Sequence, residues 1–195
     1  MGVLTGCIPR PDVLVSDLND NIFAAEFGDL LIGKAAEVYA SPRPFFDNTY
    51  PTAPLRKIVQ MVFERLADPK QNGASLRLST GFGAGKTHTL MALWHLGNNI
   101  GDATLGTDLL PAAGRPKSVR VVAIDAGKAG IPIFSSHGRV QVKSLWGEMF
   151  YQLGGQKALK ALGDVDDPEA SPHADALDDV APADPLLILL DELVI

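Results

Sequence analysis

The sequence predicts an α/β fold built on a mainly parallel β-sheet, with a helical and irregular extension before it. Two apolar runs, at residues 119–124 and 186–190, are typical of strands buried on both faces. Segments whose apolar residues recur at helical spacing precede and separate these runs. Helices that alternate with strands along a chain favour a parallel sheet covered by helices.

The composition is that of a globular protein rather than a disordered or membrane-spanning one. Of the 195 residues, 46% are hydrophobic and 21% are charged. The longest purely aliphatic run, residues 186–190, is far shorter than the ~20 apolar residues that a membrane helix needs. No secretory signal pattern opens the chain, and a single cysteine, Cys7, excludes an internal disulfide. We therefore expect a cytoplasmic protein that does not enter a membrane.

The net charge of −6 is unevenly distributed. Residues 161–195 contain ten acidic residues and no Lys or Arg, so the rest of the chain is close to neutral. This pattern lacks the broad basic surface of a DNA-binding domain, and it leaves direct contact with nucleic acid undecided. We expect the acidic segment 164–184 to be a solvated connection, although it could also dock a basic partner.

The N-terminal part is expected to be an extension that packs on the rest. Residues 21–31 have the spacing of a short helix, and residues 41–54 have the proline and turn residues of an extended connection. Apolar residues from Leu55 to Leu66 then form one helical face, and Asp68-Pro69 ends that helix. We place the domain boundary here, with an extension over residues 1–70 and a core over residues 71–195.

The elements of the core follow in alternation. We expect strands at 75–79, 119–124 and 186–190, helices at 87–96 and 145–153, and loops at 98–116, 127–142 and 164–184.

A glycine-rich stretch between the first expected strand and helix carries the clearest chemical signal. The phosphate-loop pattern G-x-x-x-x-G-K-[ST] is matched by Gly85, Lys86 and Thr87, whereas Thr80 stands where the first glycine is expected. Bare backbone N–H groups and a helix N-terminus together bind phosphate. Lysine then reaches the β- and γ-phosphates, and the threonine hydroxyl ligates Mg²⁺. The predicted nucleotide-binding residues are Gly81, Phe82, Gly83, Ala84, Gly85, Lys86, Thr87 and His88.

A second motif lies at the end of the last apolar run. Residues 186–190 lead directly into Asp191 and Glu192, which is the Walker B arrangement. Ligands of parallel sheets bind at the carboxyl ends of the strands. We expect Asp191 to hold Mg²⁺ together with Thr87, and Glu192 to activate the attacking water, with Glu192 and Lys86 as the catalytic residues. This order of motifs fits the P-loop ATPases that use a separate catalytic glutamate.

Other readings of the same residues remain open at this point. The glycine-rich stretch could be an ordinary turn before a helix, and an apolar strand can end in acidic residues without any catalytic role. His88 fits a packing or surface role better than contact with nucleotide. Asp125, at the end of the middle strand, could face the site or cap its own strand equally well.

Several stretches of the chain resemble a family of large bacterial and archaeal AAA+-like P-loop ATPases of unknown function, often encoded beside DNA methyltransferases in phage-defence loci. The stretches that carry the resemblance are FAAEFGD (23–29), FFDNTY (45–50), GAGKTHTL (83–90), ALWHL (92–96), LWGE (145–148), YQLGG (151–155) and ILLDEL (188–193). The segments at 98–118 and 160–184 contribute little to it.

The resemblance implies ATP and Mg²⁺ as ligands and assigns their binding to Lys86, Thr87, Asp191 and Glu192. It also implies a sheet in the order 5-1-4-3-2, of which this chain supplies candidates for strands 1, 2 and 3. Family members are several times longer, and their sensor residue, arginine finger and helical lid follow the Walker B motif. The chain thus resembles an N-terminal fragment, a truncated gene or one half of a split protein, with an incomplete sheet.

These observations lead us to expect an ATP-binding ATPase module that acts within a DNA-modification or phage-defence system. The expected partners are ATP and other proteins of such a system, with oligomerisation as a further possibility. Two alternatives stay open: a nucleotide-binding switch or scaffold without turnover, and an inactive truncated fragment. On the fragment reading, residues 1–195 alone would hydrolyse little or no ATP and would tend to associate.

Overall fold

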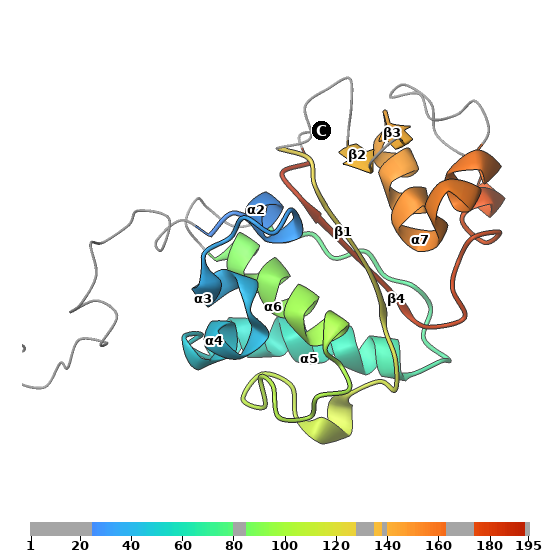
Figure 1. The fold of residues 1–195 in the computed structure, drawn as a ribbon. Coiled ribbons are helices and arrows are strands. Elements are labelled where there is room, and N and C mark those ends of the chain that lie inside the picture. Colours follow the sequence, from blue (N-terminus) through green and yellow to red (C-terminus); the bar gives the residue numbers. More distant parts are fainter. Residues whose placement is uncertain (1–24, 80–84, 128–134, 138–139, 163–173, 194–195) are drawn as a thin grey trace, which may run out of the picture.

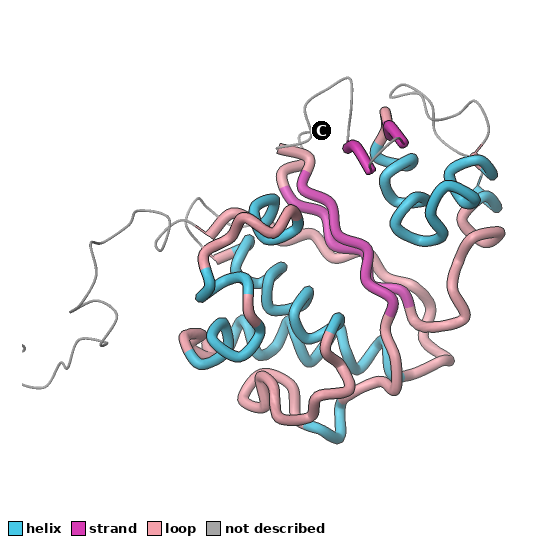
Figure 2. Tube along the Cα trace, in the orientation of Figure 1, coloured by secondary structure: helices cyan, strands magenta, loops and turns pink. Residues whose placement is uncertain are grey.

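A pair of parallel strands runs between two groups of helices in the computed structural model, which describes residues 25–79, 85–127, 135–137, 140–162 and 174–193 (Figure 1). Helices α2 to α6 lie on one side of the strand pair, and α7 lies on the other (Figures 1 and 2). The described elements are the helices α2 (Phe27–Leu31), α3 (Glu37–Ala40), α4 (Pro42–Asp47), α5 (Ala53–Ala67), α6 (Lys86–Asn98) and α7 (Leu145–Ala161), the 3₁₀ turns η3 (Ala112–Gly114) and η5 (Ala174–Ala176), and the strands β1 (Arg120–Asp125), β2 (Ser135–His137), β3 (Val140–Val142) and β4 (Leu186–Asp191).

Strands β1 and β4 confirm the predicted parallel pairing. Their register places Arg120 opposite Leu186 and Asp125 opposite Asp191. The two strands are neighbours, as strands 2 and 3 are in the expected order. The mixed α/β class is therefore confirmed, whereas a two-stranded parallel sheet is too small to establish a P-loop NTPase fold.

The strand pair buries its two faces unequally. Ala123, Leu187 and Leu189 pack into the large core that α5 and α6 share with the N-terminal helices. The opposite face packs against α7, where Val122 is fully buried. Residues 186, 188 and 190 are only half-buried on that face. The prediction that this strand is buried on both faces is therefore wrong for β4, because α7 covers β1 more fully than it covers β4.

The helices predicted from Leu55 to Leu66 and over residues 87–96 are confirmed as α5 and α6, with small changes of boundary. Helix α5 buries Val59 and Phe63 completely, and the Thr52 hydroxyl accepts a hydrogen bond from the Leu55 N–H at its N-terminus. Helix α6 packs closely on β1. A Cβ atom at Gly97 would lie 2.6 Å from Val121 Cγ2, so glycine permits this approach.

Two predicted connections contain regular structure. Residues 41–54 were expected to be extended, but they include α4, whose first residue, Pro42, occupies a position where a helix tolerates proline. Burial of Phe45 stabilises this short helix. The loop expected over residues 127–142 contains the antiparallel pair β2–β3. The helix expected over residues 21–31 is present as α2, with residues 21–24 outside the described part of the chain.

The strand predicted at residues 75–79 is not formed. Residues 72–79 have no assigned secondary structure and are largely exposed, with Leu76 49% exposed. A strand is defined by hydrogen bonds to a neighbour, and β4 pairs only with β1 in the described structure. The apolar residues of this segment therefore have no ladder to join.

Helix α7 is longer than predicted and is bent. Beyond the expected residues 145–153 it continues to Ala161, with non-helical backbone angles at Gly154 and Gly155. Arg120 at the start of β1 donates hydrogen bonds to the carbonyls of Gln152, at 2.7 Å, and Leu153, at 3.2 Å. These bonds satisfy carbonyls that the bend removes from the helical pattern.

The side chain of Gln152 closes the outer edge of β1. The Arg120 N–H donates to the Pro185 carbonyl, and the Ala126 N–H donates to the Asp191 carbonyl. Because backbone groups alternate in direction along a strand, the Ala123 N–H and C=O point away from β4. Gln152 Oε1 accepts from the Ala123 N–H at 2.9 Å, and Gln152 Nε2 donates to the Ala123 carbonyl at 2.9 Å. Nε2 also donates to Glu148 Oε1 at 2.7 Å. The Gln152 amide thus makes the two hydrogen bonds to Ala123 that a neighbouring strand would otherwise make.

We predict that Gln152→Ala lowers the free energy of unfolding by about 1–3 kcal/mol, because it leaves the Ala123 N–H and C=O without partners. Urea denaturation followed by circular dichroism measures the change. Gln156→Ala is the matched control, since Gln156 is an exposed glutamine of the same helix. Equal effects of the two substitutions would show that the amide does not stabilise the strand edge.

Candidate functional site

Helix α6 begins directly after Gly85, at the end of the glycine-rich stretch. Gly85 precedes the helix with a φ of +78°, in the left-handed region that glycine adopts without strain. Lys86 is the first helical residue. The Gly85 carbonyl accepts hydrogen bonds from the N–H and the hydroxyl of Thr89, at 2.9 and 2.8 Å. Four other predicted nucleotide-binding residues, Gly81, Phe82, Gly83 and Ala84, lie outside the described residues.

The two predicted magnesium ligands lie in direct contact. The Thr87 hydroxyl donates a hydrogen bond to Asp191 Oδ2 at 3.2 Å, although the two residues are 104 positions apart in the sequence. The other carboxylate oxygen of Asp191 accepts from the Glu192 N–H at 3.0 Å. The fold therefore brings the start of α6 and the carboxyl end of β4 to one point, as the two motifs predict.

Hydroxyl and carboxylate oxygens are the donors that Mg²⁺ prefers. Magnesium commonly takes one or two protein ligands and completes its shell with phosphate oxygens and water, so Thr87 and Asp191 fit this ion. Within the described part of the chain, no group of three His, Cys, Asp or Glu side chains is arranged to hold a metal by protein ligands alone.

Glu192 follows β4 directly and has an unusual backbone. Its φ is +54°, a left-handed value that is uncommon for residues other than glycine. The residue is exposed. It lies beside Gly127, where an added Cβ would come within 2.9 Å of Glu192 Cβ. Glu192 therefore lies beyond the sheet edge, next to the Thr87–Asp191 contact.

Asp125 lies opposite Asp191 and binds backbone N–H groups. Its Oδ2 accepts from the Gly28 N–H at 2.7 Å, and its Oδ1 accepts from the Gly127 N–H at 2.9 Å. Of the two roles that the sequence left open, the capping role is observed, because the carboxylate holds the turn that follows β1. The bond to Gly28 could not be expected from the sequence, since it joins residues 97 positions apart.

His88 packs against the N-terminal helices. Its ring stacks on Phe45 with 4.6 Å between ring centroids, and its Nε2 lies 2.9 Å from the Thr49 hydroxyl oxygen. The packing role anticipated for this side chain is therefore observed. Phe45 and Thr49 belong to one of the stretches that carry the family resemblance, and His88 belongs to another. These stretches contact each other across the core.

A second histidine of α6 is fully buried in the same aromatic cluster. The His95 ring lies 4.9 Å from Phe45 and from Trp94, and its Nε2 lies 2.8 Å from the Tyr39 carbonyl oxygen. Its Nδ1 is buried and has no hydrogen-bond partner among the described residues. Burial lowers the pKa of His95 below its usual value, opposed by the Tyr39 carbonyl and reinforced by His88. Burial also lowers the pKa of His88.

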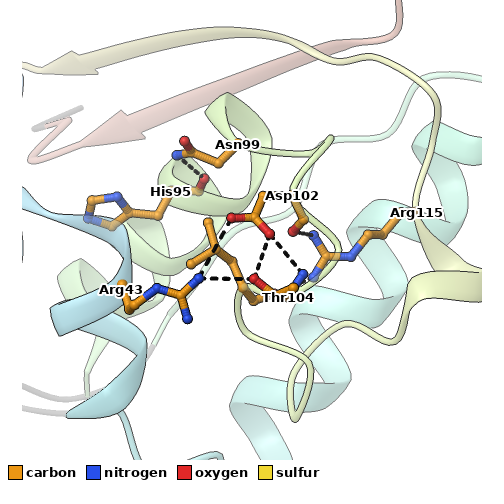
Figure 3. Close-up of polar contacts among 7 residues, drawn as sticks. Arg43, His95, Asn99, Asp102, Thr104 and Arg115 are labelled. Atoms are coloured by element: carbon orange, nitrogen blue, oxygen red, sulfur yellow. Dashed lines mark hydrogen bonds and ion pairs between the residues drawn. The ribbon is translucent and has the colours of Figure 1, made fainter.

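A polar network that sequence analysis missed holds the loop after α6 (Figure 3). The Arg115 guanidinium donates to the carbonyls of Asp102, Leu105 and Leu110. The Asp102 carboxylate accepts from the Thr104 N–H at 2.9 Å and from its hydroxyl at 2.6 Å.

The network also reaches the N-terminal helices. Arg43 of α4 donates to the Thr104 hydroxyl oxygen at 3.0 Å and forms an ion pair with Asp102 at 3.9 Å (Figure 3). The hydrogen bonds from Thr104 are the main reason that the pKa of Asp102 is lowered. Scattered single residues of this kind leave no periodic pattern in a sequence.

Comparison with known proteins gives one match. A family model described as DUF499 N-terminal domain matches residues 8–195. No curated protein and no solved structure is similar enough to this chain to count as a match. Among the described residues, no helix has the length and apolar character required to cross a membrane.

We predict that the free energy of unfolding falls as the pH is lowered from 7.5 to 5.5. Burial holds the folded pKa of His88 and His95 below the unfolded value of about 6.5, so the unfolded chain takes up protons that the folded chain does not. This contribution is fully present above pH ~6.5 and is lost as the pH falls towards the folded pKa values. Urea denaturation at several pH values measures it. The double variant His88→Gln/His95→Gln should show a smaller loss over the same range, and an unchanged loss would assign the effect to other groups.

Proposed function

We propose that this chain, which belongs to the DUF499 N-terminal domain family, is an ATP-binding P-loop module that supports ATP hydrolysis in the full-length gene product. The observation that carries this proposal is the 3.2 Å hydrogen bond between the Thr87 hydroxyl and Asp191. Two motifs chosen separately from the sequence meet there, at the N-terminus of one helix and the carboxyl end of one strand.

The surroundings of this contact suit an anionic phosphate chain. The N-terminus of α6 carries partial positive charge and backbone N–H groups without helical partners. Gly85 leaves the approach to these groups clear of a side chain. Lys86, at the first position of the helix, supplies a full positive charge. These features favour a ligand with several phosphates over a neutral one.

The two motifs assign the proposed roles to four side chains. Lys86 binds the β- and γ-phosphates, and Thr87 with Asp191 would hold Mg²⁺, which would neutralise charge at the transferred phosphate. Glu192 accepts a proton from the attacking water as the oxygen forms its bond to the γ-phosphorus and the bond to the ADP oxygen breaks. The nucleotide leaves as ADP and the γ-phosphoryl group as inorganic phosphate.

The wider role is proposed on the resemblance alone. Proteins of DNA-modification or phage-defence systems are the partners that it suggests, and ATP turnover would then drive or gate their action. A nucleotide-dependent switch would need the same phosphate-binding residues but not a general base. The presence of Glu192 directly after Asp191 favours turnover over a binding-only switch.

We predict that Lys86→Ala lowers the affinity for Mg-ATP by about 100-fold or more, because hydrogen bonds to charged groups contribute roughly 1.5–3 kcal/mol each and this lysine reaches two phosphates. Isothermal titration calorimetry on residues 1–195 measures the affinity. Lys70→Ala, at an exposed lysine outside the site, should bind as the wild type does. Equal affinities of wild type and Lys86→Ala would refute the nucleotide site.

We predict that Glu192→Gln in the full-length gene product keeps Mg-ATP affinity and loses about 10²–10⁴-fold in turnover, because the amide preserves shape but cannot accept the proton. A phosphate-release assay measures turnover. Glu64→Gln, at an exposed position of α5, controls for the loss of one negative charge. Turnover at the wild-type rate in Glu192→Gln would show that this residue is not the general base.

A further inference from the structure

The turn that follows β1 forms a surface against which Glu192 packs. An added Cβ at Gly127 would lie 2.9 Å from Glu192 Cβ, which is closer than such atoms approach, and it would also crowd Glu192 Cγ at 3.1 Å and Asp125 Oδ1 at 3.3 Å. The φ of Gly127 is not in the left-handed region, so its backbone does not itself require glycine. The space occupied by Glu192 therefore depends on the absence of a side chain at residue 127.

Three hydrogen bonds hold this turn in place. The Asp125 carboxylate binds the Gly127 N–H at 2.9 Å and the Gly28 N–H of α2 at 2.7 Å. The Ala126 N–H donates to the Asp191 carbonyl at 3.0 Å, which extends the pairing of β1 with β4 past the end of β1. Glu192 thus packs against a turn that is held both to β4 and to α2.

Glu192 needs such an external support because its own backbone is unfavourable. A non-glycine residue with a φ of +54° persists only where its surroundings hold it there. The Gly127 turn is suited to hold it, because the turn is anchored to both the sheet and the N-terminal segment.

We propose that Gly127 is a positioning residue for the catalytic carboxylate of Glu192, and that Asp125, held by Gly28, fixes Gly127 in place. This rests on the proposed function, because positioning has a catalytic consequence only if Glu192 is the general base. The N-terminal helix α2 then belongs to the active-site framework, although it supplies no group to the nucleotide. A misplacement of about 1 Å at a reacting group can cost about 100-fold in rate.

The test compares two glycine substitutions in the full-length gene product. Gly127→Ala should lower kcat for ATP by about tenfold or more and leave the affinity for Mg-ATP within about twofold of the wild type. Gly73→Ala is the matched control, since a Cβ there meets nothing within 4 Å and its φ is not left-handed. It should change neither quantity. Asp125→Ala should reproduce the loss of kcat, because it frees the turn.

A second measurement tests the contact without using activity. Gly127→Ala should lower the urea midpoint of residues 1–195 in the wild-type background and lower it less in a Glu192→Gly background, where the Glu192 side-chain atoms are absent and only the contact with Asp125 Oδ1, at 3.3 Å, remains. Such a double-mutant cycle isolates the pairwise contact.

The outcomes separate this proposal from the proposed function. Wild-type kcat in Gly127→Ala, while Glu192→Gln is inactive, would overturn the positioning role and leave the ATPase assignment standing. An equal loss of affinity and kcat would also overturn it, because it would indicate general distortion of the site. Wild-type turnover in Glu192→Gln, or no turnover in the wild type, would overturn the proposed hydrolysis and the positioning role with it.

Discussion

The parallel pairing of β1 with β4 is the interaction on which the rest of the structure depends. Its register sets Asp125 beside Asp191 at one edge, and it creates the two faces that α6 and α7 cover. The central residues of β1 are buried on both faces, so the pairing is stabilised by apolar packing as well as by hydrogen bonds. A shift of β4 by one residue would turn Asp191 to the other face of the sheet, away from Thr87 of α6.

Helix α6 connects this strand pair to the N-terminal segment. Its first turn bonds to Asp191 through Thr87, and its other face holds the aromatic cluster of the N-terminal helices around His88 and His95. Together with the Gly28–Asp125 bond, these contacts tie residues before position 50 to the elements that carry the motifs. The large hydrophobic core crosses the boundary at residue 70, so the segment before it contributes directly to the placement of α6. The division into two domains stays a prediction.

The two edges of the strand pair differ in chemistry. Gln152 of α7 occupies the outer side of β1 and satisfies the Ala123 backbone, so that edge is closed to further strands. Among the described residues, no strand pairs with the other side of β4, and residues 72–79 do not form the strand that the sequence predicts there. Pairing of strands can therefore extend from β4 but not from β1.

The sequence by itself determined the mixed α/β class, helices α5 and α6, both strands of the parallel pair and the meeting of Thr87 with Asp191. Apolar runs and helical periodicity are local features of a sequence, so they predict strands and helices without knowledge of the fold. Each motif also has a fixed place, one at the start of a helix and the other at the end of a strand. It predicted a strand at residues 75–79 that is absent, because strand formation depends on a partner that local composition does not reveal.

The tertiary structure alone decided the bond from Asp125 to Gly28, the edge closure by Gln152 and the packing of Glu192 on Gly127. Each of these joins single residues far apart in the chain. Such contacts follow from how packed elements are oriented in space, and no periodic pattern in the sequence encodes them.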